Sequence, residues 1–375
     1  KGKRADQWLI AAGCLTERNR EVISTNVKGV DGFIGTRRWM DILDLIDELR
    51  KNPHTPRYHL PEAATVGKDE KGVLRASVQG VSAYLKIADG CRRPCAFCSI
   101  PLIKGTTVSR PIDVIIREAE ELQLRGIKEL ILIAQDTTDY GYDLGIKDGL
   151  VVLLEKLLPR IPDIPWLRIL YSYPGYVSDR LIDLMSDSPQ ILHYFDIPLQ
   201  HADPTILKNM KRPSDIDWVY RTVEKMRKRI PDLAIRSTFI VGYPGETEKE
   251  FQTLLNFIEE MQMDHVGAFT FSFEKGTSSE PLGDPVSKEE KEERLRRLME
   301  LQESISLKRN QSLIGKKMNI LIEGSSDGIS VGRSYRDAPE IDGLVIVEGS
   351  VPLGTMQPVQ ITGAMTHDLT GLIIK

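Results

Sequence analysis

The sequence predicts an α/β protein in which six strand–helix units form a parallel sheet, flat or curled, and a small OB-like β-barrel follows. Within residues 83–275, apolar runs typical of strands alternate with amphipathic runs typical of helices. From residue 313 onward, short β-like runs are separated by glycine-rich turns instead. Three of the four cysteines, Cys91, Cys95 and Cys98, lie within eight residues, directly after the first strand of the array.

The first segment, residues 1–52, carries the pattern strand, helix, strand, helix. QWLIAAG and VDGFIG predict the strands, and TERNREVIS and WMDILDLIDELR predict the helices. Two strands and two helices are too few for an independent core of this type, so we expect the back half of a larger α/β domain. Because the chain begins with Lys1 rather than Met, we expect a fragment. Residues 53–80 begin with a proline-rich stretch and predict a linker.

The strand–helix array spans residues 81–286. The expected strands are AYLKIA, KELILIA, WLRILY, LHYFDI, AIRSTFIV and HVGAFTF, with helices such as IDVIIREAEELQLRG and EKEFQTLLNFIEEM between them. A polar or glycine-rich cluster follows every strand: DGC, QDTTDYG, SYPG, PLQH, GYPGE and SFEKGT. In barrels of such units the active site lies at the C-terminal ends of the strands, so we expect the chemistry at that rim.

Residues 287–312 predict one charged helix with seven basic and six acidic side chains, which we interpret as a solvated connector. Residues 313–375 contain the β-like runs MNILIEG, LVIVEG and PVQITGAM and predict the β-barrel.

The composition of the 375-residue chain excludes several classes of protein. The net charge of −4 and the pI near 6.0 give no reason to expect a polyanionic partner. No apolar run approaches the roughly 18 residues of a membrane span, and no signal peptide is visible. Four cysteines, three of them clustered, do not form a disulfide framework in a chain this long, so we expect a reducing, cytoplasmic setting.

The spacing of the three clustered cysteines, C-x3-C-x2-C, favours an iron–sulfur cluster over zinc. Structural zinc sites are closed by four ligands, but the next cysteine is Cys14, 77 residues before Cys91, and no histidine lies within 30 residues. A cluster with three protein thiolates leaves one iron open to bind another molecule. Zinc and incidental thiols remain the alternatives.

The stretch IADGCRRPCAFCSIP resembles the radical S-adenosylmethionine (SAM) superfamily. The resemblance implies a partial (β/α)6 barrel and a 4Fe–4S cluster on Cys91, Cys95 and Cys98, whose open iron binds SAM and yields a 5′-deoxyadenosyl radical. The rim also carries candidate SAM contacts, among which Arg236 suits a carboxylate and the glycines suit close backbone approach. These candidates are Phe97, Gln135, Asp136, Arg236, Gly242 and Gly245, with Gln200 and His201 as weaker ones. Phe97 is equally well read as a packing residue, and a lone histidine is more often structural.

Together, AAGCLTER, SRP, YSYPG, DIPLQHADPTILKNMKRP and FIVGYPGET resemble the methylthiotransferase family over essentially the whole chain. The family has an N-terminal α/β domain whose three cysteines bind a second 4Fe–4S cluster, a radical SAM barrel, and a C-terminal TRAM β-domain. Cys14 matches the last of those three cysteines. The resemblance thus implies that residues 1–52 are the C-terminal half of that N-terminal domain, lacking its start.

Two main branches of the family modify either an aspartate of a small-subunit ribosomal protein (RimO type) or an adenosine in tRNA (MiaB type). GRSYRDAPEIDG, at residues 332–343, is similar to the RimO branch. Residues 313–375 carry five Lys/Arg against seven Asp/Glu, and an acidic TRAM domain suits a basic ribosomal protein better than tRNA. The alternatives are the tRNA branch, another radical SAM chemistry, and a zinc-stabilised binding module without enzymatic activity.

The resemblance implies a reaction in which the adenosyl radical removes a β-hydrogen of the target aspartate, and a methylated sulfur at the second cluster is transferred to that carbon. An external electron donor is also implied. Because only Cys14 of the second ligand set is present in this sequence, we expect this chain to cleave SAM but to methylthiolate poorly.

Overall fold

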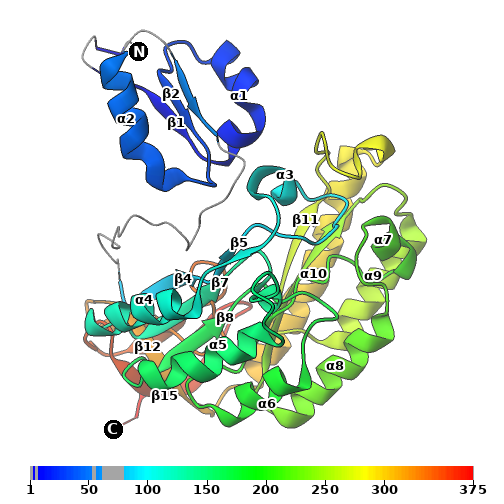
Figure 1. The fold of residues 1–375 in the computed structure, drawn as a ribbon. Helices are drawn as coiled ribbons and strands as arrows, with labels where there is room; N and C mark the ends of the chain where they lie inside the picture. The colour runs from blue at the N-terminus through cyan, green and yellow to red at the C-terminus, as the bar shows by residue number, and fades with distance from the viewer. Residues whose placement is uncertain (1–2, 5–6, 53–55, 61–79, 375) are drawn as a thin grey trace.

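The structure, a computed structural model, describes residues 3–4, 7–52, 56–60 and 80–374. Figure 1 shows a small N-terminal unit above a larger strand–helix array, with the C-terminal β-strands at the lower end. The elements of the N-terminal unit are β1 (Ile10–Ala12), α1 (Cys14–Asn26), β2 (Gly32–Ile34), the 3-10 helix η1 (Trp39–Asp41), α2 (Ile42–Lys51) and β3 (Arg57–His59).

The N-terminal unit contains a third strand that the sequence pattern did not indicate. β1, β2 and β3 form a parallel sheet in that order, and β3 lies inside the stretch expected to be a linker. β3 is Arg-Tyr-His and contains no aliphatic residue, so it has no apolar run to reveal it. The remainder of that stretch, 53–55 and 61–79, lies outside the described residues.

The array is a curled, open parallel sheet, as the resemblance implies. Six of its strands form two three-stranded parallel sheets, β4-β7-β8 and β9-β10-β11, and a parallel bridge between Leu167 of β8 and Ile191, just before β9, links the two sheets. The short strands β5 and β6 pair with each other antiparallel. No pairing joins β4 to β11 within the part of the chain that the structure describes. The strands are β4 (Ser82–Lys86), β5 (Ala88–Asp89), β6 (Val108–Ser109), β7 (Glu129–Ile133), β8 (Trp166–Ile169), β9 (Tyr194–Asp196), β10 (Ala234–Val241) and β11 (His265–Thr270).

Helices cover the outside of the curled sheet (Figure 1). The helices described in the array are α3 (Ile100–Lys104), α4 (Ile112–Leu124), η2 (Thr137–Asp139), α5 (Gly149–Leu157), η3 (Leu158–Arg160), α6 (Asp179–Asp187), α7 (Pro204–Asn209), α8 (Ile216–Arg229), α9 (Glu248–Met261) and η4 (Glu280–Leu282). The apolar faces of α4, α5, α6, α8 and α9 share one continuous core with the strands. None of the helices in the described ranges is long and apolar enough to cross a membrane.

The long helix α10 (Lys288–Gln311) is not the solvated connector that its charge pattern predicted. One face of it is buried, and α10 packs against β11 and α9. Many of the buried positions are polar and bind the array directly: Lys291 donates to the Phe271 carbonyl oxygen, and Gln302 donates to that of Met263 at 3.1 Å. The prediction was wrong because it assigned every charged side chain to water.

The C-terminal β-barrel is closed, with five strands in the order β12-β13-β14-β16-β15. They are β12 (Lys317–Ser326), β13 (Ile329–Arg333), β14 (Val345–Glu348), β15 (Met356–Ala364) and β16 (Leu369–Ile373). The sequence indicated β12, β14 and β15, whereas β13 and β16 carry too few apolar residues in a row to be recognised.

Residues 332–343 of this β-barrel and the array residues they contact form what we call the seam. The array residues include the first residues of three strands: Glu129, Tyr194 and His265. Arg333 pairs with Glu129, and the Tyr194 hydroxyl donates to Asp342 at 2.6 Å. The seam therefore covers the N-terminal ends of the strands, opposite the rim where chemistry is expected.

The seam also weakens the charge argument made from the sequence. Arg333, Arg336, Asp337 and Asp342 are buried or half-buried there, and Glu323 of β12 is half-buried against Arg333, so these five contribute little to the surface that a partner meets. Among the described charged residues of this β-barrel, the exposed ones are Lys316 and Lys317 against Asp327, Glu340 and Glu348. The acidic excess on the surface is small.

Candidate active site

The three clustered cysteines lie on the loop that follows β5, at the C-terminal end of the array. Gly90, directly before Cys91, has a φ of +75°, and a Cβ there would collide with the Thr106 carbonyl oxygen. The Cys91 N–H donates to the Gly105 carbonyl oxygen at 3.1 Å, and the Ala96 N–H donates to that of Met210 at 2.8 Å. Backbone contacts thus hold this loop against two other parts of the chain.

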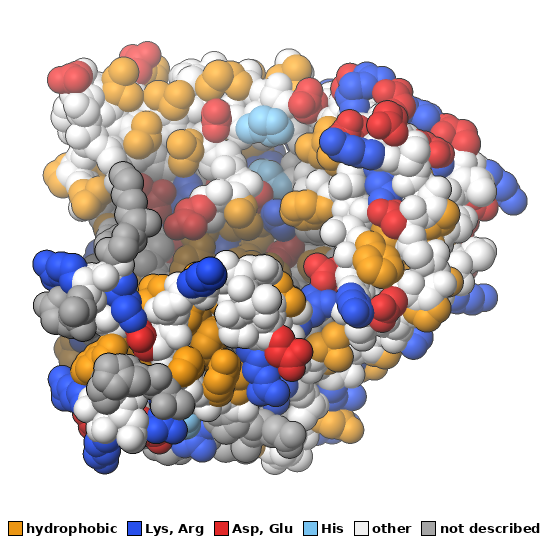
Figure 2. Space-filling model, turned by 90° about the horizontal axis from the view of Figure 1, so that it is seen from above, with side chains coloured by type: hydrophobic (Ala, Val, Ile, Leu, Met, Phe, Trp, Pro, Cys, Tyr) orange, Lys and Arg blue, Asp and Glu red, His pale blue; other side chains and the backbone are white. Residues whose placement is uncertain are grey.

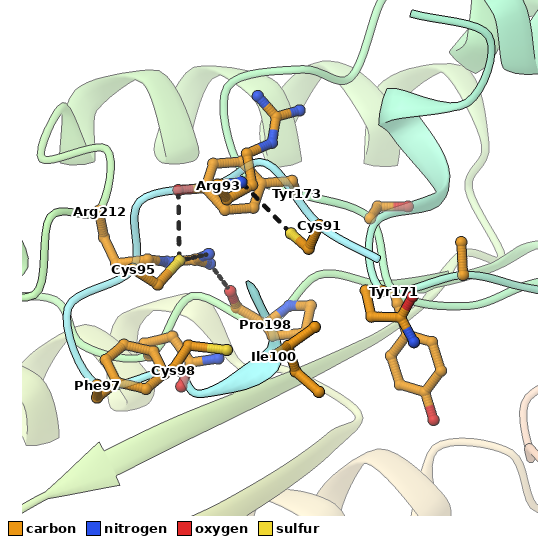
Figure 3. Close-up of a pocket in the computed structure, with 14 residues that line it drawn as sticks. Cys91, Arg93, Cys95, Phe97, Cys98, Ile100, Tyr171, Tyr173, Pro198 and Arg212 are labelled. Carbon is orange, nitrogen blue, oxygen red and sulfur yellow. Dashed lines mark hydrogen bonds between the residues drawn. The ribbon is translucent and has the colours of Figure 1, made fainter. Parts of the chain in front are cut away.

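All three thiols border one cavity of about 330 Å³. In Figure 3 the cysteines lie on one side of it and Tyr171 lies on the other. The segments after β5, β7, β8 and β9 all contribute to the wall. The lining residues are Cys91, Arg93, Cys95, Phe97, Cys98, Ile100, Ala134, Gln135, Tyr171, Ser172, Tyr173, Pro198, Gln200 and Arg212.

The thiols are arranged around the cavity rather than around one point. Burial raises the pKa of Cys91 to about 11 and also raises the pKa of Cys98, so both thiolates require positive charge beside them. Within the described ranges, no group of three or more Cys, His, Asp or Glu side chains is gathered closely enough to hold a single metal ion. Three thiols on the wall of a cavity are a donor set that suits a larger, multi-iron group.

Two arginines between Cys91 and Cys95 fix the loop through buried carboxylates. Arg92 binds both oxygens of Asp139, at 2.7 and 2.8 Å, and Arg93 Nε donates to Asp136 at 2.6 Å. Burial raises the pKa of Asp136, although Arg93 opposes the rise. These bidentate and charge-assisted contacts tie the cysteine loop to the residues that follow β7.

Arg212 brings a cation to the Cys95 sulfur. Its Nη1 lies 3.5 Å from Cys95 Sγ, and its guanidinium also donates to the Pro198 carbonyl oxygen and lies 4.1 Å from the centre of the Tyr173 ring. The Tyr173 hydroxyl lies 3.8 Å from the same sulfur. Because Arg212 is 8% exposed, its charge acts in a poorly screened environment beside the thiols.

Among the described residues of the wall, two buried side-chain oxygens lack a hydrogen-bond partner. Gln135 Oε1 and Ser172 Oγ are both buried and unpaired, and both residues line the cavity. Buried polar groups are normally satisfied, so unpaired ones beside a cavity indicate a polar ligand. Three thiols, a buried cation and unpaired oxygens together fit an iron–sulfur cluster with a polar molecule next to it.

Of the candidate SAM contacts, the structure brings Phe97, Gln135 and Gln200 to the wall of this cavity. The other five do not line it. Asp136 is buried and binds Arg93, while His201 is buried and lies 3.2 Å from Glu246 Oε2, with its Nδ1 accepting from the Asp203 N–H at 2.9 Å.

Arg236 forms ion pairs away from the cavity, and Gly242 and Gly245 lie in a backbone turn. The Arg236 guanidinium lies 3.4 Å from both Asp196 and Asp342, at the seam side of the array. Gly242 has a φ of +72°, and a Cβ there would meet the Lys291 side chain. Gly245 has a φ of +92°, so these two glycines serve the strand-to-helix turn before α9.

The sequence did not single out several residues of the wall. Ser172 and Tyr173 belong to SYPG, a cluster expected at the rim without a role for any one residue, and Tyr171 precedes it. Arg212, 117 residues from Cys95, lies in a motif that carried only the family resemblance. The position of SYPG after a strand indicated the rim but not which of its side chains border the cavity, and no local pattern links Arg212 to the thiols.

Cys14 is exposed at the start of α1. The N-terminal unit contacts both sides of the rim: Arg18 pairs with Glu274 after β11, and Arg37 Nε donates to the Ile103 carbonyl oxygen of α3 at 2.9 Å. Figure 2 views the molecule from above and shows basic and acidic side chains interspersed on this face, without a field of one sign.

The sequence is similar to two protein families and to several named proteins. Residues 85–258 match the Radical SAM superfamily and residues 314–374 match the TRAM domain. The chain is 46% identical to the ribosomal protein uS12 methylthiotransferase RimO of Chloroflexus aurantiacus, over 98% of this chain and 85% of that protein. It is 42% identical to the protein of the same name from Roseiflexus sp., over 100% of this chain and 84% of that protein, and 41% identical to that of Aquifex aeolicus, over 97% and 81%.

Proposed function

Because the chain belongs to the RimO family of ribosomal protein uS12 methylthiotransferases, we propose that the cavity bordered by Cys91, Cys95 and Cys98 is where it modifies uS12. The proposal rests on one observation above all: three thiols and two unpaired polar oxygens border the same cavity at the C-terminal end of the array. The chain is a radical SAM enzyme, and this class implies SAM and a 4Fe–4S cluster.

In this proposal the three thiolates hold the cluster, and the polar wall holds SAM. When bound, the pair supplies one-electron reduction and the removal of a hydrogen atom from the substrate. Gln135 and Ser172 offer unpaired oxygens to the polar end of SAM, and Phe97 offers an aromatic face. Gln200 lies on the same wall and is a further candidate contact.

The remaining side chains shape and shield the site. Arg212 places a positive charge at Cys95 Sγ and offsets the cost of a buried thiolate. Ile100, Ala134 and Pro198 give the wall an apolar part that excludes water from the reacting groups. Arg92 and Arg93 keep the cysteine loop fixed to Asp139 and Asp136.

The substrate side of the proposal is a side chain of uS12, specifically the β-carbon of an aspartate. The relatives that match nearly the whole chain at 40–46% identity carry the ribosomal protein name, which does not favour the tRNA branch. A contribution of the TRAM domain to binding uS12 through acidic residues remains part of the proposal. It now rests on fewer exposed charges than the sequence count indicated.

Three finer points belong to the same proposal. We infer that Cys14 is one ligand of a second 4Fe–4S cluster, since it is exposed on the unit that contacts both α3 and the loop after β11. An external donor supplies the electron. A cytoplasmic location follows from a ribosomal protein substrate.

The test is anaerobic reconstitution of the chain with iron and sulfide, followed by SAM, a strong reductant and recombinant uS12. We expect 5′-deoxyadenosine to form and its yield to rise when uS12 is present. A matched control is Cys14→Ala, which leaves the three cavity thiols intact, against Cys95→Ala, which removes one. Cleavage of SAM that survives Cys95→Ala would contradict the assignment of the cavity.

A further inference from the structure

Tyr171, like Gln200, lines the cavity with a left-handed backbone conformation. The φ of Tyr171 is +63°, in a region that bulky residues rarely adopt because it is energetically costly. Tyr171 is 41% exposed and lies across the cavity from the cysteines (Figure 3). Glycine would adopt this conformation without strain, so the chain keeps a tyrosine side chain here at an energetic cost.

The strained backbone is held by a buried carboxylate. The Tyr171 N–H donates to Asp196 Oδ2 at 3.0 Å, and the Tyr171 carbonyl oxygen accepts from the Thr137 N–H at 3.0 Å. The next residue, Ser172, donates its N–H to the Asp196 carbonyl oxygen at 2.9 Å. Asp196 is fully buried at the end of β9, so both its side chain and its backbone fix the wall.

Asp196 is connected in turn to the seam. Arg236 lies between Asp196 and Asp342 of the β-barrel, with its guanidinium 3.4 Å from each. Asp342 is itself fixed by the Tyr194 hydroxyl at 2.6 Å and by the Ala338 N–H at 2.9 Å. Asp342, Arg236 and Asp196 thus form a continuous polar chain from the C-terminal β-barrel to Tyr171, which we call the relay.

We propose that the relay sets the shape of the active-site wall: the C-terminal β-barrel, through Asp342, Arg236 and Asp196, holds Tyr171 in the conformation in which it positions the polypeptide substrate. The substrate half of this inference rests on the proposed function. Asp342, Arg236 and Asp196 are positioning residues, because they act through Tyr171. In this inference Arg236 links the two carboxylates of Asp196 and Asp342.

The side chain of Tyr171 suits a polypeptide substrate. A partly exposed ring with a hydroxyl offers a large apolar surface with one hydrogen-bonding end, at the cost of fixing only two side-chain torsions. Tyr171 borders the cavity across from the thiols. The hydrogen bonds to Asp196 and Thr137 keep this surface preorganised, which reduces the entropy lost on binding.

The first experiment tests the relay without any substrate. Amide hydrogen exchange is measured by mass spectrometry on the reconstituted chain, for peptides that contain Tyr171, in wild type and in Asp342→Asn. We expect exchange at Tyr171 to become at least tenfold faster in the variant, because its N–H loses a fixed acceptor. Tyr335→Phe is the matched control, since it removes a different seam hydrogen bond, from the Tyr335 hydroxyl to the Asp232 carbonyl oxygen.

Unchanged protection at Tyr171 in Asp342→Asn, or an equal loss in Tyr335→Phe, would overturn the relay. Should Asp342→Asn fail to fold, Arg236→Lys interrupts the same chain one residue further along and carries the same expectation.

The second experiment tests the substrate half through a double-mutant cycle. The dissociation constant of fluorescently labelled uS12 is measured with SAM present for wild type, Asp342→Asn, Tyr171→Gly and the double variant. We expect each single change to weaken binding about tenfold and the double variant to be no weaker than Tyr171→Gly, because both act through one side chain. Additive losses would show that Asp342 acts by another route and would refute the inference. If wild type does not bind uS12, the proposed function is refuted, and so is the claim that Tyr171 positions the substrate. The hydrogen-exchange experiment would still test whether the relay holds Tyr171.

Discussion

At the scale of single residues, the site depends on how the cysteine loop is held as much as on its thiols. Gly90 lets the chain turn into the loop, and Arg92 and Arg93 tie the loop to the residues after β7. Arg212 comes from beyond α7 to the Cys95 sulfur. Two of these contacts can be tested by comparing a substitution that breaks the contact with a substitution at a similar residue that does not make it.

Gly90→Ala is expected to destabilise the protein much more than Gly105→Ala. Both glycines have a φ of +75°, but a Cβ at Gly90 meets the Thr106 carbonyl oxygen, whereas a Cβ at Gly105 meets nothing within 4 Å. The left-handed backbone costs about 1–2 kcal/mol at either site, and the collision at Gly90 adds about 1–3 kcal/mol. Denaturant unfolding measures the difference. Equal losses would show that the collision relaxes at no cost.

Arg212→Gln is expected to lower the reduction potential of the reconstituted cluster. A buried cation beside one ligand sulfur favours the reduced, more negative state, and hydrogen bonds to the sulfurs act in the same direction. We expect roughly tenfold less reduced cluster at a fixed poise, or about 59 mV for a one-electron couple, in an anaerobic redox titration. Arg92→Gln is the control because Arg92 binds Asp139 instead of a sulfur. An equal shift in both variants would contradict the specific role of Arg212.

At the scale of elements, α10 shows why a charged helix is not necessarily a solvated one. Arg294 is buried and binds Glu246 at 2.7 Å, and Glu246 also accepts from the Gly242 N–H at 2.9 Å. Arg296, two residues later, is exposed and binds Glu293 and Glu300 of the same helix. The two arginines have the same chemistry in the sequence and opposite environments in the fold.

Arg294→Ala is expected to destabilise the protein by about 3–5 kcal/mol, because it leaves the Glu246 carboxylate buried without its cation. Arg296→Ala is expected to leave the unfolding midpoint unchanged within error, because exposed pairs within a helix contribute little. Thermal unfolding followed by circular dichroism compares the two. A similar loss in both would restore the solvated-connector interpretation.

Elements with a strong period were predictable, whereas those held by distant contacts were not. The expected strand AIRSTFIV and helix EKEFQTLLNFIEEM match β10 and α9 to the residue, since both carry a long run of one pattern. β3, with three residues and no aliphatic side chain, exists because β2 pairs with it. The same holds for the cavity wall. The spacing of the cysteines predicted them as site residues, whereas Arg212 is distant from them in sequence and lies beside Cys95 only in the folded chain.

At the scale of the whole molecule, the C-terminal β-barrel packs against the array through buried ion pairs and apolar contacts. Glu129 is buried at the seam between Arg168, at 2.7 Å, and Arg333 of the β-barrel. An apolar cluster adjoins this contact and includes Ile131 from β7 and Leu321 from β12. Contacts of this kind join residues about 200 positions apart, which no local sequence pattern reports.

The seam predicts a pH dependence of stability. Burial alone raises the pKa of Glu129, but Arg168 and Arg333 outweigh it and hold the pKa below its usual 4.5. The stabilisation from Glu129 is therefore fully present above about pH 5 and is lost as the pH falls through the lowered pKa. We expect Glu129→Gln to cost about 3–5 kcal/mol at pH 7 and progressively less below pH 4. Denaturant unfolding at several pH values checks this, and a difference independent of pH would contradict it.

The measurement that tests the central claim most directly is the count of irons per chain after anaerobic reconstitution, with 5′-deoxyadenosine formation on the same sample. We predict about four irons on this chain, the loss of nearly all of them when Cys91, Cys95 and Cys98 are replaced by alanine, and 5′-deoxyadenosine only when those thiols are present. About eight irons would mean that Cys14 finds enough partners for a second cluster in this chain. Zinc in place of iron, or SAM cleavage that survives loss of the three thiols, would contradict the assignment of the cavity as the radical site.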